Sequence, residues 1–257
     1  MIHNFTVTFH SFYSIIEVMK SSFIKNPIIL PLFVALFTLF SCTAKIDGNI
    51  TANGSAVMTV SMSLGQRVTA LIRSVAAAGG QEPARILDGQ SIARSMSKSS
   101  GIDSVTLKNT SQSAVEGQVR VSQINTFLAS ADKKGLITFE QGRSGGRCVF
   151  SINMESGSAM LDYLSPDIRD YLNALMAPIA TEEKMSKTEY LELVASFYNK
   201  PISDEIASSR IRLSVDLPGA VTSVKGGTFS GKKAVFDIPL LDLLVLETPL
   251  SYEVNWK

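Results

Sequence analysis

The sequence predicts an α+β protein in which an antiparallel β-sheet of about eight strands carries helices on one face. Near both ends, at 44–64 and 210–256, apolar residues alternate with polar ones. This two-residue period is typical of strands with one face on a core. Between 156 and 207 the apolar residues recur every three or four positions, which is the helical period. We therefore expect hairpins at both ends of the chain and helices between them.

The first predicted element is a β-hairpin over 44–64. The pair Asn53-Gly54 at its centre is a strong signal for a two-residue hairpin turn. From Gln66 the apolar residues change to helical spacing, and Gly79-Gly80 is expected to end that helix. A second, more polar helix should follow and end near Lys98.

The next part of the chain predicts two further hairpins with a helix between them. The expected strands are 104–108, 115–121, 136–140 and 147–154, and the helix covers 124–131. The last turn, Gly142–Gly146, is rich in glycine like a phosphate-binding loop. It lacks the following helix and the Gly-Lys-Ser/Thr sequence of such loops. We therefore expect a flexible hairpin turn.

Three local sequence signals divide the helical region 156–207 into separate helices. Pro166 is expected to start a helix, and Ser186–Glu189 has the spacing of a capping box. Pro201 is expected to stop that helix, with Ser203–Glu205 capping a last short turn.

Strands are expected again at 210–217, 221–229, 233–238 and 250–256. The segment Ile238–Leu246 is apolar on both sides, which favours a buried central strand. If it were exposed instead, it would form a patch for a lipid or a partner. Leu240 and Leu241 would then be its most exposed residues.

The stretch Met19–Cys42 is typical of a secretory signal peptide with a lipoprotein cleavage site. Lys20 and Lys25 form a basic head, and residues 28–40 are apolar. That run is shorter than the ~20 apolar residues of a membrane-spanning helix. The final Leu-Phe-Ser-Cys resembles a relaxed, spirochaete-like lipobox, which predicts diacylglycerol and palmitate on Cys42. An ordinary cleavable signal and an uncleaved anchor remain the alternatives.

These features predict three segments. Residues 1–18 are expected to be a wrongly assigned, disordered upstream start, 19–41 the signal peptide, and 42–257 one domain. The mature chain of 216 residues carries 22 basic and 22 acidic side chains. This balance gives no polybasic surface for nucleic acid. We expect an exported protein attached to the membrane or cell envelope, at an inner or outer membrane.

Both histidines, His3 and His10, precede the predicted cleavage site. The mature chain would therefore lack the usual neutral-pH base and the commonest metal ligand. We expect a protein that is not an enzyme and has no cofactor or metal. Cys148 lies among apolar residues, so a buried structural thiol is expected there.

Two stretches resemble the LppM-type bacterial lipoprotein domain. One is Cys42 followed by the strand pair 46–60 with its Asn53-Gly54 turn. The other is Arg210–Ile238, with its strand, Pro-Gly-x-Val, glycines and second strand. That family often has Asn-Gly where this chain has Gly226-Gly227, and Trp where it has Phe236. The resemblance implies an envelope-anchored domain that binds a ligand or lipid, and it provides no catalytic residues.

The leading hypothesis is a lipid-anchored, non-enzymatic envelope protein that binds an apolar ligand, a lipid, or an envelope partner. The ligand would lie between the sheet and the helices. The candidate contact residues are Leu240, Leu241, Tyr190 and Phe197.

Two alternatives stay open. An assembly or adhesion module would use an aromatic face made by Tyr163, Tyr171, Tyr190, Phe197 and Tyr198. A glycan-acting enzyme would need two carboxylates facing each other across a cleft. The candidates for that role are Asp162, Asp167, Asp170, Glu182 and Glu183.

Overall fold

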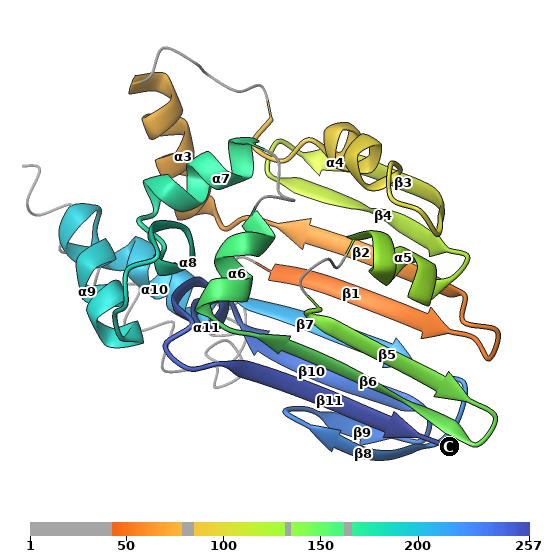
Figure 1. Cartoon of the computed structure of the whole chain (residues 1–257). Coiled ribbons are helices and arrows are strands. Elements are labelled where there is room, and N and C mark those ends of the chain that lie inside the picture. Colours follow the sequence, from red (N-terminus) through yellow and green to blue (C-terminus); the bar gives the residue numbers. More distant parts are fainter. Residues whose placement is uncertain (1–42, 79–84, 132–134, 162–165) are drawn as a thin grey trace, which may run out of the picture. The chain divides into compact units, whose positions relative to one another are not determined.

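The computed structural model of the chain describes residues 43–78, 85–131, 135–161 and 166–257 (Figure 1). The predicted upstream start, the signal peptide and the lipidation site Cys42 lie outside them. None of the described helices has the length and apolar character needed to cross a membrane.

The described strands form two sheets, whereas the sequence predicted one antiparallel sheet. The larger has the order β3-β4-β2-β1-β7-β10-β9, and the smaller has the order β5-β6-β11-β8. The smaller sheet is antiparallel throughout, but in the larger one β1 and β7 run parallel. Alternation identifies the core-facing residues of each strand, but it does not say which strands share a layer.

The strand bounds are as follows. The large sheet contains β1 Thr43–Ile50, β2 Ala56–Ser63, β3 Ile102–Ser111, β4 Ala114–Val121, β7 Arg210–Asp216, β9 Thr228–Ser230 and β10 Lys233–Pro239. The small sheet contains β5 Ile137–Gly142, β6 Gly145–Ile152, β8 Val221–Lys225 and β11 Leu250–Trp256. The predicted hairpins at 44–64, 104–121 and 136–154 are confirmed, with Gly54 at φ 81° in the β1–β2 turn. The predicted strand 221–229 is instead divided into β8 in the small sheet and β9 in the large one, and only β9 pairs with β10.

One face of the large sheet is apolar and the other polar. Ile46 lies opposite Val60 on β2 and Leu213 on β7, which places all three on the inward face. The neighbouring Lys45 lies opposite Ser61 and Arg212 on the outward face. The predicted alternation therefore gives this sheet its two faces.

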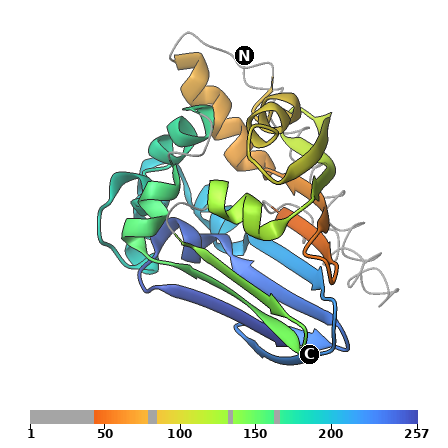
Figure 2. The ribbon, with the colours of Figure 1, turned by 45° about the vertical axis from the view of Figure 1, so that its right-hand side comes forward.

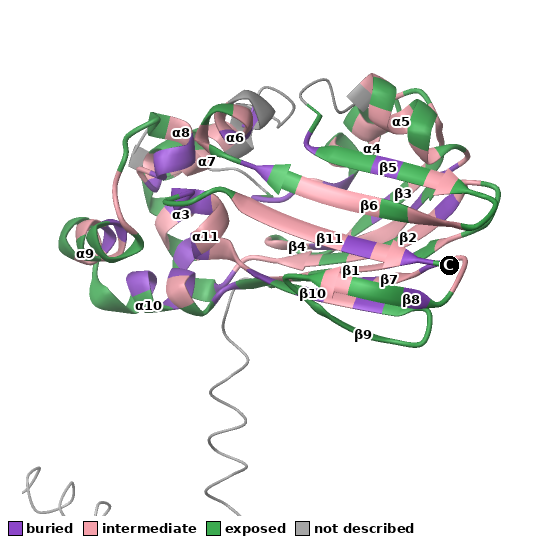
Figure 3. Ribbon diagram, turned by 60° about the horizontal axis from the view of Figure 1, so that its bottom comes forward, coloured by how far each residue is buried: buried purple, intermediate pink, exposed green. Residues whose placement is uncertain are grey.

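The small sheet packs on the inward face of the large one. Figure 2 shows it over the β7–β10 part, with α5 beside it. The cluster between the layers includes Phe139 and Trp256 of the small sheet and Phe236 of the large one. Figure 3 marks such buried positions along the strands.

The described helices occupy two places. Of these, α4 and α5 pack on the inward face of the large sheet, where Ile92 and Phe127 contact apolar clusters on β3 and β4. The others gather at one end of the sheets around a separate core (Figure 1). The predicted arrangement, with all helices on one face, is therefore wrong. The bounds are α3 Gln66–Ala78, α4 Gly89–Met96, α5 Ile124–Ala131, α6 Met154–Met160, α7 Pro166–Ala174, α8 Pro178–Thr181, α9 Lys187–Phe197, α10 Lys200–Ser208 and α11 Leu240–Val245.

Two local predictions are corrected. Pro201 lies in the first turn of α10, where Asn199 caps the helix by accepting a hydrogen bond from the Ile202 N–H. Proline is tolerated there because first-turn N–H groups need no partner within the helix. The segment Ile238–Leu246 is largely buried as expected, but most of it forms α11. A short apolar run fits a buried helix as well as a buried strand.

Glu205 joins two helices in the core. It belongs to α10, is only 3% exposed, and accepts hydrogen bonds from the backbone N–H groups of Arg67 (3.1 Å) and Val68 (2.9 Å). These donors open α3, where N–H groups lack intrahelical acceptors. A Cβ atom at Gly65 would lie 2.1 Å from the Glu205 carboxylate, so a side chain at position 65 would displace that carboxylate from its cap.

Replacing Glu205 with alanine should lower the free energy of unfolding by about 1–3 kcal/mol, because buried N–H groups would lose their acceptor. Chemical denaturation of the full chain measures this. Glu192→Ala is the matched control, since that glutamate is exposed on α9. Equal stability of the two variants would contradict the capping role.

Candidate functional site

The four residues predicted to contact a ligand do not form one site. Tyr190 is fully buried, and its hydroxyl donates to the Leu175 carbonyl at 3.1 Å, so it is a core residue. Leu241 is buried in the same helical core and Leu240 is half-buried against it. Phe197 is 67% exposed on α9.

The residues of the two alternative hypotheses are also dispersed. Asp170, Glu182 and Glu183 are exposed, whereas Asp162, Tyr163 and the side chain of Asp167 lie outside the described residues. Tyr171 and Tyr198 pack against the helical core. Within the described ranges, no group of three or more His, Cys, Asp or Glu side chains is placed to hold a metal ion.

Cys148 points between the two sheets. It lies opposite Val254 on β11 and packs against the cluster between the layers. Burial raises the pKa of its thiol to about 11, which keeps it protonated at neutral pH.

Several inward-facing apolar residues of the large sheet are only partly buried. We call three of them the apolar strip: Ala44, Ile46 and Met62. Met62 lies opposite Ala44, and Val60 lies opposite Ile46. All three strip residues are half-buried, and none belongs to an apolar cluster formed by the described residues. The strip lies at the start of β1, immediately after Thr43.

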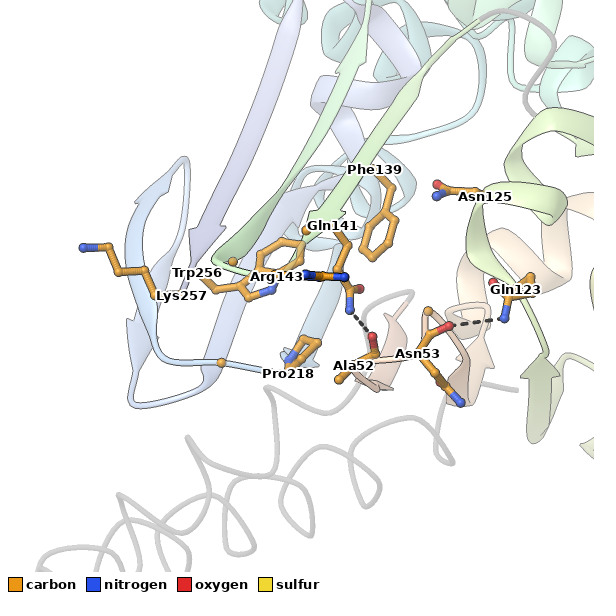
Figure 4. A pocket seen from close by; sticks show the side chains of 14 residues that line it. Ala52, Asn53, Gln123, Asn125, Phe139, Gln141, Arg143, Pro218, Trp256 and Lys257 are labelled. Atoms are coloured by element: carbon orange, nitrogen blue, oxygen red, sulfur yellow. Dashed lines mark hydrogen bonds between the residues drawn. The ribbon is translucent and has the colours of Figure 1, made fainter.

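A polar cleft of about 550 Å³ lies at the opposite end of β1, and we call it the tip cleft (Figure 4). The β1–β2 turn, the β5–β6 turn, the start of α5 and the ends of β7 and β11 meet there. It is lined by Ala52, Asn53, Gly54, Gln123, Asn125, Phe139, Gln141, Gly142, Arg143, Gly145, Pro218, Gly219, Trp256 and Lys257.

Hydrogen bonds fix the walls of the tip cleft. The Gln141 amide donates to the Ala52 carbonyl at 2.6 Å, which ties β5 to the β1–β2 turn. The Gln123 amide donates to the Asn53 carbonyl at 3.2 Å, which ties the start of α5 to the same turn (Figure 4). Three separate segments are thus held together before any ligand binds.

Two aromatic rings support the floor. The centroids of Phe139 and Trp256 are 5.8 Å apart, and both rings are almost fully buried. Gly146 permits this packing, because a Cβ there would lie 2.3 Å from the Trp256 ring and 2.5 Å from the Glu140 carbonyl oxygen. Glycine at position 146 is therefore required by the packing of β11.

The polar groups of the cleft are only partly used. Arg143 and Asn125 are exposed, and their side chains make no hydrogen bond or ion pair within the described part of the chain. The Gln141 Oε1 atom is buried and accepts no hydrogen bond there. None of the described residues that line the cleft is acidic.

The comparisons with known proteins give one structural match. No protein-family model and no curated protein sequence matches the chain. The NMR structure of the folded domain of LppM from Mycobacterium tuberculosis is similar at a TM-score of 0.38 and 9% identity. The match covers 85% of this chain and 90% of that domain. At this level of similarity, membership of the LppM-type family stays a prediction.

The sequence did not indicate the tip cleft. Its residues come from turns and strand ends that are far apart in the chain, and they follow no periodic pattern. The one signal was the glycine-rich turn Gly142–Gly146, which places Arg143 in the cleft.

Gly146→Ala should lower the free energy of unfolding by about 1–3 kcal/mol, because the added methyl group overpacks Trp256. Trp256 is the only tryptophan of the chain, so its fluorescence reports directly on the cleft floor. We expect its emission to move to longer wavelength as the ring gains contact with water.

Gly142→Ala is the matched control, since the nearest atom to its Cβ would be 3.8 Å away. If both variants kept the wild-type emission and stability, the packing argument would fail.

Proposed function

We propose that this chain is an exported envelope protein that is anchored by lipid on Cys42 and holds an apolar ligand, the acyl chain of a lipid, against the apolar strip. It acts by binding and not by catalysis. The observation that carries the proposal is the position of the strip. Ala44 and Ile46 are half-buried, inward-facing apolar residues that follow the predicted anchor within four positions.

The position of the strip matters because of the length of the tether. Only Thr43 separates Cys42 from Ala44. An anchor on Cys42 would hold the start of β1 at the bilayer surface, where lipid acyl chains are available. Covering the strip would remove apolar surface from water, which is favourable by about 25 cal/mol per Å².

The chemistry around the strip supports binding. Its inward neighbours Val60 and Leu213 are also apolar. A site of this composition attracts a ligand by the hydrophobic effect and offers no group that exchanges protons near neutral pH.

Cys42→Ala should abolish incorporation of radiolabelled palmitate and release the protein from the membrane fraction. Cys148→Ala is the matched control, because its thiol is inward-facing and protonated. Labelling that persists in Cys42→Ala, together with unchanged membrane attachment, would contradict the anchoring proposal.

Ile46→Thr should reduce the amount of lipid that co-purifies with the full chain about tenfold, because two apolar carbon groups are lost at about 0.8 kcal/mol each. Mass spectrometry of lipid extracts from purified protein measures this. Val57→Thr is the control, since it makes a similar change on the outward face of the same hairpin.

Equal amounts of co-purified lipid in Ile46→Thr and Val57→Thr would contradict the ligand proposal. So would the absence of co-purified lipid from the wild-type protein. A protein that co-purifies in stoichiometric amount instead of lipid would favour the assembly alternative.

A further inference from the structure

We propose that the tip cleft is a second binding site, separate from the apolar strip, that takes an anionic, hydroxyl-rich ligand of the acidic saccharide class. The cleft and the strip lie at opposite ends of β1, which has eight residues. At about 3.3 Å per residue, the strand separates them by about 25 Å.

The charge of the ligand follows from Arg143. Its guanidinium is exposed, lines the cleft and has no acidic partner within the described part of the chain. Lys257 also borders the cleft, but Figure 4 shows its side chain directed away from Arg143, so the positive charge in the cleft is that of Arg143. No described lining residue has an acidic side chain. A guanidinium offers paired donors that match the two oxygens of a carboxylate.

The hydroxyl groups of the ligand follow from the Asn125 amide. Asn125 presents both donors and an acceptor, and Figure 4 shows it across the cleft from Arg143. Gln141 is held by the Ala52 carbonyl and its Oε1 atom is buried, so this residue shapes the wall and is not a ligand contact. Sugar hydroxyls both donate and accept, so they match the Asn125 amide better than a simple anion does.

The rigidity of the cleft favours binding. Two amide hydrogen bonds join its three segments, and the buried Trp256 ring supports the floor. Because these groups are positioned in advance, little conformational entropy is lost when a ligand binds. Phe139 and Trp256 are too buried to stack on a sugar ring, so recognition is by hydrogen bonds and charge.

The test is calorimetric titration of the full chain in detergent with three probes. These are tetragalacturonate, its neutral methyl ester and a tetraglutamate peptide. We expect tetragalacturonate to bind, and each of the other two to bind about tenfold or more weakly, since each lacks either the charge or the hydroxyls.

Arg143→Ala should weaken tetragalacturonate binding about tenfold or more through loss of a charge-assisted contact. Arg120→Ala is the matched control, because Arg120 is an exposed arginine on β4 outside the cleft. Thermal melting checks that each variant is folded. Arg143 lies in an exposed turn, so removing its side chain should leave the melting temperature unchanged.

Co-purified lipid is measured in the same variants, and it should not change in Arg143→Ala. Failure of the lipid proposal would leave the saccharide result intact, so the two are distinguishable. The inference is overturned if no probe binds at millimolar concentration, if the ester or the peptide binds as tightly as the acidic saccharide, or if Arg143→Ala keeps wild-type affinity.

Discussion

The parallel pairing of β1 with β7 is the constraint on which the rest of the structure depends. It places Thr43 opposite Arg210 and Asn49 opposite Asp216, although each pair is far apart in the sequence. Parallel strands share a direction, so both begin at the end that would hold the anchor and both end at the tip. The turn after β1 and the Pro218-Gly219 turn after β7 therefore meet in the tip cleft. An antiparallel pairing would have put these turns at opposite ends of the sheet.

The two faces of the large sheet differ in chemistry, and only the inward face is covered by other elements. On the outward face, charged residues pair across strands, as Lys108 does with Glu116 and Lys233 with Asp216. Such exposed pairs contribute little to stability, about 0–1 kcal/mol each. On the inward face, the small sheet, α4 and α5 cover most apolar residues. The apolar strip is the exception on this face, whereas Arg143 lies in the β5–β6 turn of the small sheet and borders the tip cleft.

The sequence predicts local structure well where the pattern is periodic or a cap is complete. The hairpin at 44–64 and the capping box of Ser186 and Glu189 are both found as expected. The division into two sheets was missed because the alternation of β6 and β11 looks the same whichever layer they join. The helix α11 was missed because Leu240–Val245 is apolar except for Asp242, and one polar residue is too few to show a period. The tip cleft could not be predicted from single motifs, since Gln141 and Ala52 become neighbours only through sheet packing.

The distance between the two proposed sites has a physical consequence if Cys42 carries the anchor. A cation beside the bilayer would interact with anionic headgroups and would be occupied by them. Electrostatic interactions in physiological salt decay over about 8 Å, and the length of β1 is about three times that distance. Arg143 at the tip would therefore be screened from the membrane and free to discriminate among ligands in solution. The apolar strip, at the other end of the same strand, would lie where lipids are concentrated. The direction of β1 thus accounts for the position of the apolar strip near the membrane and of Arg143 far from it. If β1 ran in the opposite direction from the anchor, the two would change places.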